Sequence, residues 1–283
     1  MTRPTGRRLL LLGLITSLAA ALSACATPAR IPEPSPAPTG PVTAQLDQAL
    51  KTISGGSDQF GVYLEDLRAG TTYSYNGDYA SQSASMAKPM IVAMALRKAG
   101  GVAQLGPDNQ EKARKAIMNS DNDAASALWE YAGGGPAYTA LATELGMTNT
   151  HLDEAKPTQW SWTWTTPADQ VKLLDVLAGG TSSALSAEEA AFIYDLMGQV
   201  QDDQTWGVGQ PKSSSVSVHL KNGWVQFKSS DGLWAVNSIG TVSGQGRDYR
   251  LAVMTRQADF DTGRELTSAV GKWVFTIQGE ANK

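Results

Sequence analysis

The sequence predicts an α/β (α+β) fold. In it, strands from both chain ends form one antiparallel sheet with flanking helices, and a mainly helical lobe lies between them. Strand patterns occur near residues 60–75 and again after residue 214, while the segments between them have helical periodicity. The length also fits, because 283 residues, 42% of them hydrophobic, can bury a sizeable core.

The folded part is expected to begin near Val42. The segment TAQLDQALKTI has apolar residues at helical spacing, and SGG ends it. Next, FGVYLEDL and TTYSYN flank RAG, a pattern typical of a β-hairpin. A long helical segment is then expected to begin at Ser85.

The middle of the chain is expected to be helical, and its end to return to strands before a last helix. The helical segments are NQEKARKAIMNS, NDAASALWEYA, PAYTALATELG, PADQVKLLDVLA and SAEEAAFIYDLMGQV. The strand segments after Ser214 are SVSVHL, LWAVNSIGTV and DYRLAVMTR, and the closing helix is TGRELTSAVGKWVFTI.

The N-terminus has the three parts of an export signal. MTRPTGRR is positively charged, LLLLGLITSLAAAL is apolar, and LSAC ends the segment, so residues 1–24 are expected to be a signal peptide. The apolar run is shorter than a usual membrane span. RRLLLL leaves both the Sec and the twin-arginine route open.

The ending LSAC resembles a bacterial lipobox, which implies that Cys25 becomes the lipidated first residue of the mature protein. An ordinary signal peptide followed by an incidental Cys is the alternative. Residues 25–41 are rich in Pro and small residues and suit an extended tether, which leaves 42–283 as the folded domain. We therefore expect a bacterial, extracytoplasmic protein held at the cell membrane by a lipid.

Charge and composition argue against several kinds of partner. From Cys25 onward the chain has 20 basic and 27 acidic residues, a net charge of −7, and no basic patch with interleaved aromatics, so no nucleic-acid partner is expected. Cys25 is the only cysteine, which excludes an intrachain disulfide. His151 and His219 lack ligand spacing, so neither a metal nor a cofactor is expected. We expect a monomer.

The segment SQSASMAKPMIVAMAL places Ser85 three residues before Lys88. Positions three apart share a helix face, and a serine hydroxyl becomes a good nucleophile only when a nearby group takes its proton. A lysine can do this if its pKa is lowered by burial or by a neighbouring positive charge. Taken alone, the pair is equally consistent with a capping serine and a surface lysine.

Two further motifs follow in order. SDN lies at Ser120-Asp121-Asn122 between two helical segments, and KNG lies at Lys221-Asn222-Gly223 directly after SVSVHL. In this order, SxxK, SDN and KNG resemble the motifs of the class A β-lactamases and their relatives, the penicillin-binding D,D-peptidases. The resemblance extends from about Val42 to the C-terminus.

The resemblance implies a role for each motif residue. Ser85 would be the acylated nucleophile and Lys88 its proton acceptor. Ser120 would relay a proton to the leaving nitrogen, and Asn122 would hold Lys88 and the substrate amide. Lys221 would attract the substrate carboxylate.

The same resemblance implies an oxyanion hole and a substrate-binding strand. The N–H groups of Ser85 and Trp224 would form the oxyanion hole. Gly223 would let the substrate backbone approach the strand. Asn222, where the family usually has a hydroxyl residue, would donate to the substrate carboxylate with altered geometry. Asp121 is expected to cap a helix and to take no part in the chemistry.

A larger departure concerns removal of the acyl group. The family has a loop reading roughly E-x-E-L-N-E-A before a T-T-P-A helix start, and HLDEA and TTPAD align with parts of it. The family's general-base Glu then falls on Asn149, which cannot act as a base. Asp153 is the carboxylate that could replace it. In the WSWTW segment after this loop, Trp160, Trp162 and Trp164 would share one face if the segment were extended. They are expected to anchor it, and binding of a glycan or peptide is the alternative.

Three functions are consistent with this pattern. The first is a serine acyl-transfer enzyme that acts on β-lactams or D-amino-acid stem peptides of peptidoglycan and deacylates slowly. The second is a binding or regulatory lipoprotein that keeps the fold without turnover. The third is an active β-lactamase that uses Asp153.

Overall fold

The computed structural model of the protein describes residues 41–227 and 231–280. The expected signal peptide (1–24), Cys25 and all of the tether (25–41) except its last residue lie outside these residues. Among the described residues, no helix combines the length and the apolar character needed to cross a membrane.

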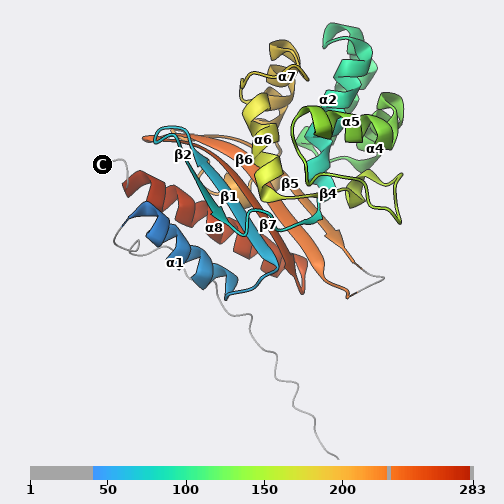
Figure 1. Ribbon diagram of the computed structural model, residues 1–283. Coiled ribbons are helices and arrows are strands. Elements are labelled where there is room, and N and C mark those ends of the chain that lie inside the picture. The colour runs from blue at the N-terminus through green and yellow to red at the C-terminus, as the bar shows by residue number, and fades with distance from the viewer. Residues whose placement is uncertain (1–40, 228–230, 281–283) are drawn as a thin grey trace, which may run out of the picture. The chain divides into compact units, whose positions relative to one another are not determined.

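One antiparallel sheet of five strands lies at the centre, in the order β2-β1-β7-β6-β5 (Figure 1). Its strands come from the N-terminal hairpin and from the C-terminal part of the chain, which confirms the predicted α/β (α+β) fold. The two parts meet directly, because Leu64 of β1 is paired with Leu251 of β7. The strands are β1 (Phe60–Asp66), β2 (Thr71–Tyr75), β5 (Ser217–Gln226), β6 (Trp234–Gly244) and β7 (Arg247–Gln257).

Two helices, α1 (Val42–Ser54) and α8 (Phe260–Glu280), cover one face of the sheet (Figure 1). Helix α1 begins at the predicted residue and is followed by Gly55, whose φ of 61° is a left-handed conformation that glycine adopts without strain. Apolar residues of both helices, such as Leu50 and Val274, are fully buried in one cluster with the sheet.

The helical lobe lies on the other face of the sheet (Figure 1). Its α6 contacts β1 and β7 directly, and the other helices pack around α2. The helices of the lobe are α2 (Lys88–Ala99), α3 (Pro107–Met118), α4 (Asn122–Ala132), α5 (Gly134–Glu144), α6 (Pro167–Leu177) and α7 (Ala187–Met197). They correspond to the predicted helical segments within a few residues at each end.

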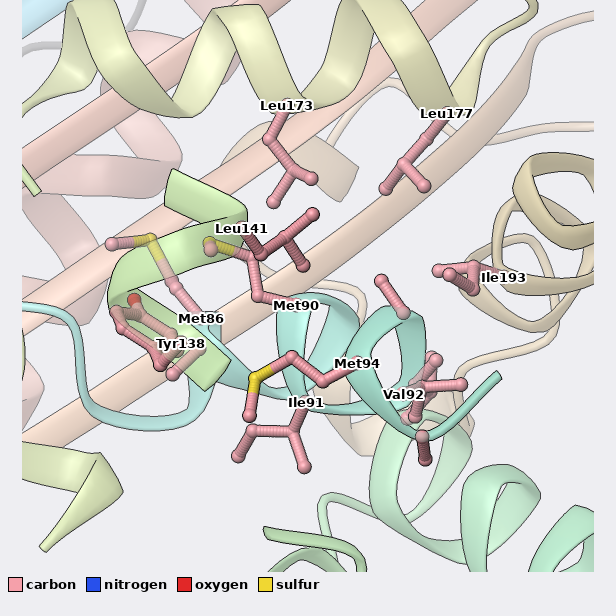
Figure 2. Packing of buried hydrophobic residues seen from close by; sticks show 14 of the residues in the cluster. Met86, Met90, Ile91, Val92, Met94, Tyr138, Leu141, Leu173, Leu177 and Ile193 are labelled. Carbon is pink, nitrogen blue, oxygen red and sulfur yellow. The ribbon is translucent and has the colours of Figure 1, made fainter. Parts of the chain in front are cut away.

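Helix α2 is the core of the lobe. All of its residues from Lys88 to Leu96 are buried, as expected for a helix that is apolar on every side. Figure 2 shows its Met90 and Met94 in the same cluster as Leu141 of α5 and Ile193 of α7. The first residue of this helix is thereby carried into the protein interior.

Three local details differ from the sequence prediction. Ser85 lies in a 3-10 turn, Ala84–Ala87, and α2 begins only at Lys88. The KNG motif lies inside β5, because this strand extends beyond SVSVHL. The segment Trp160–Trp162 is a 3-10 turn and is not extended. The other short elements are β3 (Ser81–Gln82), β4 (Trp164–Thr165), and the 3-10 turns η2 (Ala103–Leu105), η4 (Asp202–Gln204) and η5 (Gly207–Gly209).

Candidate active site

Ser85 sits on a strained turn and lines a cavity of about 470 Å³. The residue before it, Ala84, has a φ of 48°, a left-handed conformation that costs an alanine on the order of 1–3 kcal/mol. Met86 N donates to Ser83 O at 3.1 Å and closes the turn. The strain presents the Ser85 side chain, which is half-buried, to the cavity.

Lys88, whose backbone N–H donates to Ser85 O, has no solvent exposure. Its ammonium donates to Ser120 O at 2.5 Å, to Ser120 Oγ at 3.2 Å and to Asn122 Oδ1 at 2.8 Å. These three acceptors match the three N–H groups of an ammonium. The structure thus brings Lys88 together with two of the residues that the motifs predicted for one site.

Ser120 connects Lys88 to the third motif. Its φ of 56° is again left-handed, and the next residue, Asp121, caps α4 by accepting from Ala124 N at 2.7 Å. Lys221 Nζ donates to Ser120 Oγ at 2.8 Å. One serine hydroxyl therefore lies between two buried lysines, and the capping role expected for Asp121 is the one it has.

Both lysines are easier to deprotonate than an ordinary lysine. Burial lowers the pKa of Lys88 to about 7, against a small opposing effect of Asp121. Burial lowers the pKa of Lys221 well below its usual range, and the positive charge of Lys88 lowers it further. At neutral pH the site can therefore hold a lysine in its neutral, proton-accepting form.

Gly223 allows β5 to pack against the Ser85 turn. A Cβ on this residue would lie 2.7 Å from Ser83 O, 2.7 Å from Met86 N and 2.9 Å from Ser85 N. All three are backbone atoms, which cannot move aside as a flexible side chain would. The sequence predicted that Gly223 gives a substrate room, whereas the structure uses the missing side chain to seat the turn that carries Ser85.

Gly223→Ala is therefore expected to destabilise the protein by about 1–3 kcal/mol, because the added methyl group must push the turn and the strand apart. Thermal unfolding measures the effect. Ser217→Ala, at the exposed end of the same strand, is the control and should stay within about 0.5 kcal/mol of the unmodified protein. Equal unfolding temperatures for the two variants would contradict this reading.

Asn222 is directed differently from the prediction. Its side chain is buried, and Nδ2 donates to Gln204 O at 2.8 Å and to Trp206 O at 3.3 Å. The amide therefore fixes the η4–η5 segment to β5, and Asn222 is not among the residues that line the cavity. A donor to a substrate carboxylate has to come from elsewhere.

Neither Asn149, where the family's Glu aligns, nor Asp153, the candidate deacylation residue, is among the residues that line the cavity. Asn149 is exposed, and its backbone N–H donates to Asp169 Oδ2 at 2.8 Å. Asp153 accepts from Trp164 Nε1 at 3.0 Å and from Ala155 N at 3.0 Å. The carboxylate of Asp153 thus holds its own loop together. The alignment placed both residues by sequence alone, and the loop folds so that its later part faces the site.

That later part brings Trp160 to the site. The centroid of its ring lies 5.1 Å from Lys88 Nζ, and Nε1 donates to Ser126 Oγ at 3.0 Å. The part of this loop that lies next to Lys88 is therefore the indole ring of Trp160. Trp162 instead packs edge-on against Phe227, directly after β5, with ring centroids 5.5 Å apart. The tryptophans do not share one face, because the 3-10 turn separates them.

Sequence reasoning did not single out two residues of the cavity wall. Ser126 and Glu130 follow Asn122 at intervals of four residues on α4 and line the same cavity. The helical spacing after SDN is the signal that could have found them. Trp224, predicted for the oxyanion hole, lines the cavity together with Ser85, and its ring also packs 5.3 Å from that of Phe260.

Across residues 41–227 and 231–280, no cluster of His, Cys, Asp or Glu side chains has an arrangement that could hold a metal ion. The hydroxyl-bearing residues Ser85 and Ser120 line the cavity, and the buried amines of Lys88 and Lys221 both donate to the Ser120 hydroxyl. Such a set can deprotonate a serine, let it attack a carbonyl and pass a proton to the leaving group.

Comparisons with known proteins agree with this fold. The family described as "Beta-lactamase enzyme family" matches residues 42–106 and 102–277. The class A β-lactamase of Bacteroides cellulosilyticus has 18% identity and a TM-score of 0.70, covering 86% of this chain and 100% of that one. A mutant of the class A β-lactamase of the last common ancestor of Gram-negative bacteria has 25% identity and a TM-score of 0.65, covering 83% and 97%.

The chain belongs to the β-lactamase enzyme family. It is also similar to a protein of Mycobacterium tuberculosis named "Putative lipoprotein LppW", with 26% identity over 257 residues, which are 86% of this chain and 79% of that protein. The predicted resemblance to class A β-lactamases is thus confirmed at the level of family and fold.

Proposed function

We propose that the protein is a serine acyl-transfer enzyme of the bacterial cell envelope. Ser85 attacks the carbonyl of a β-lactam or of a D-amino-acid peptide, and Lys88 takes its proton. The attack forms an ester at Ser85 Oγ, and the proton passes through Ser120 to the leaving nitrogen. The N–H groups of Ser85 and Trp224 face the developing oxyanion, and Lys221 attracts the substrate carboxylate.

One observation carries this proposal, namely the hydrogen-bonded set of Lys88, Ser120, Asn122 and Lys221 behind Ser85. Two buried amines joined through a serine are costly to keep, because burial opposes their charge. The strained backbone at Ala84 and at Ser120 supports the same reading.

The direct test is to incubate the folded domain with a penicillin and to measure the mass of the intact protein. The proposal expects a mass increase equal to that of the whole penicillin, because opening the lactam ring by acylation loses no atom. No increase at any penicillin concentration would favour the second candidate, a binding or regulatory lipoprotein. The name of the mycobacterial relative is compatible with that candidate.

The rate of acylation should depend on pH through Lys88. Only the neutral amine can accept a proton, and its pKa is about 7. The second-order labelling rate is therefore expected to fall about tenfold per pH unit below pH 7 and to level off above it. Labelling rates measured between pH 5 and pH 9 test this, with unfolding temperature followed in parallel. A flat profile would exclude Lys88 as the base.

For the location, we propose a lipid anchor at Cys25. Cys25→Ser is expected to move the protein from the membrane fraction to the soluble fraction, because the sulfur that carries the lipid is lost. Cell fractionation and metabolic labelling with a radioactive fatty acid measure this. A variant that remains membrane-bound and is processed as before would contradict the lipid anchor.

A further inference from the structure

Trp162 joins the loop of residues 150–163 to the end of β5 through a stack of side chains. Lys156 Nζ lies over the Trp162 ring, 2.9 Å from its centroid. Phe227, directly after β5, meets the Trp162 ring with the two ring planes at 88°. The guanidinium of Arg256 covers the Phe227 ring, with Cζ 3.9 Å from the centroid. Each contact is attractive, because cations favour the faces of aromatic rings and ring pairs favour edge-to-face packing.

The sheet side of this stack is firmly held. Phe227 is buried, and its backbone N–H donates to Leu233 O at 2.8 Å. Arg256 lies on β7 and forms an ion pair with Asp231 at 2.8 Å. The stack therefore gives the loop a fixed support at this end of the sheet.

The stack also joins two walls of the cavity. Ser161 lines the cavity from the loop, and Val225 lines it from β5. Trp162 follows Ser161 directly, and Phe227 comes two residues after Val225. The contact between the two rings therefore connects the loop wall to the strand wall.

The position of Trp162 determines that of Trp160, because both belong to the 3-10 turn Trp160–Trp162. Trp162 N–H donates to Gln159 O at 3.0 Å, and Thr163 N–H donates to Trp160 O at 3.3 Å. A turn closed by such short-range bonds moves as one piece. Since the Trp160 ring centroid lies 5.1 Å from Lys88 Nζ, a movement of the turn changes how well Lys88 is covered.

The turn has one other backbone attachment, at its C-terminal end. Ser83 N–H donates to Thr163 O at 2.8 Å, and the hydroxyl oxygens of these two residues lie 2.6 Å apart. A segment attached at one point can still rotate about that point, whereas a second attachment to a different neighbour prevents the rotation. Trp162 supplies this second attachment through Phe227.

We propose that Trp162 is a positioning residue, which holds the turn on Phe227 so that the ring of Trp160 stays against Lys88. This gives a role to the WSWTW segment. The inference rests on the proposed function only in taking Lys88 as the base of the reaction.

The expected consequence concerns the protonation of Lys88. Burial lowers its pKa to about 7, and the Trp160 ring is part of what buries it. Moving the ring away admits water, which favours the charged amine and raises the pKa. Loss of the cation–π contact acts in the opposite direction, but burial is the largest cause of the shift.

Charged groups on other elements also act on Lys88. Asp121, at the start of α4, opposes the lowering of its pKa, and the positive charges of Lys88 and Lys221 repel each other. Glu130 lines the cavity further along α4. The titratable side chains of the 150–163 loop are those of His151, Asp153, Glu154 and Lys156, and none of them lines the cavity. Replacing Trp162 changes none of these groups, so a changed pKa of Lys88 reports on the Trp160 ring.

The experiment uses the NMR signal of the Trp160 indole N–H and needs no penicillin. The folded domain carries isotope-labelled tryptophan, and Trp160→Phe identifies the signal by its loss. Because the ring lies against Lys88, the signal is expected to shift with pH with a midpoint of about 7, and Lys88→Met should remove this shift.

In Trp162→Ala the midpoint is expected to rise by about one pH unit or more, because Lys88 becomes better hydrated. The Trp160 indole N–H, which donates to Ser126 Oγ, should also exchange with solvent about tenfold faster, because the bond opens more often. Trp162→Phe keeps a ring between Lys156 and Phe227 and should restore both values.

Trp164→Phe is the matched control. Trp164 belongs to the same segment, is half-buried like Trp162, and stacks on His151 with ring centroids 6.3 Å apart. It is not part of the stack on Phe227, so its replacement should leave the midpoint unchanged.

Thermal unfolding shows whether each variant is folded. If Trp162→Ala does not fold, Lys156→Ala weakens the same stack and should raise the midpoint in the same direction. An unchanged midpoint in the folded variant, an equal rise in Trp164→Phe, or a signal that does not shift with pH in the unmodified protein would overturn the inference. The proposed function fails separately, if penicillin does not label the protein with Ser85 intact.

Discussion

Replacing Ser85 with alanine is expected to abolish covalent labelling by a penicillin. The variant has no hydroxyl at residue 85 to act as the nucleophile. The rest of the turn is unchanged, because alanine differs from serine only by that hydroxyl. The readout is intact-protein mass after incubation with the penicillin. Ser161→Ala is the control, because Ser161 presents a hydroxyl to the same cavity and is expected to label as the unmodified protein does.

The matching variant of the base is Lys88→Met, which is expected to slow labelling by about 10²–10⁴-fold, the usual contribution of a general base. Methionine has a similar length and no charge, so it suits a residue without solvent exposure and keeps the helix packed. Unfolding temperature checks that the variant is folded. Labelling that persists in Ser85→Ala would move the nucleophile to another residue, and fast labelling in Lys88→Met would remove Lys88 from the mechanism.

The sequence places the motif residues correctly in the fold where local pattern decides the structure. Ser85 and Lys88 are close because they are three residues apart on one turn. Ser120 and Asn122 lie at the start of α4, where Asp121 is a good capping residue. Lys221 belongs to a strand whose alternation is visible in SVSVHL. The motif order then places these segments in one site.

The sequence does not predict the parts that depend on distant contacts. The Trp160 side chain faces Lys88 because Nε1 bonds to Ser126, which is 34 residues earlier in the chain. Trp162 is held by Phe227, and Asn222 is turned toward carbonyls of η4 and its neighbourhood. None of these contacts has a periodic signature. The only repeat in the 150–163 loop is the alternation that begins at Trp160, and the 3-10 turn overrides it, so an alignment can assign the loop residues without telling which of them face the site.

This difference bears on the second step of the reaction, hydrolysis of the acyl-enzyme. A water that attacks the ester needs a base beside Lys88, and on the loop side the residue at that position is Trp160, whose indole has no basic form. Glu130, the carboxylate on the described cavity wall, is about 12 Å along α4 from Asn122 and too far to reach the ester.

The acyl-enzyme formed with a penicillin is therefore expected to be long-lived. Without a positioned base, the barrier to hydrolysis rises by about 3–5 kcal/mol, which slows decay by about 10²–10⁴-fold. The measurement is a chase, in which labelled protein is freed of penicillin and its mass is followed with time. Rapid loss of the label from the unmodified protein would show that a base is present and that the protein is an efficient β-lactamase.

Variants at three positions locate the missing group. Asn149→Glu and Asp153→Asn are expected to leave the decay unchanged, because Asn149 is exposed away from the cavity and Asp153 is bonded to Trp164. Trp160→Glu brings a carboxylate next to Lys88 and should speed the decay. Trp160→Gln also loses the ring, and glutamine has nearly the shape of glutamate but no basic group, so it should not speed the decay. The Glu–Gln pair separates the gain of a base from the loss of a buried ring, which affects both variants equally.

Decay that quickens in Asn149→Glu would mean that the loop turns that residue toward the ester. Decay that slows in Asp153→Asn would mean that Asp153 already acts as the base.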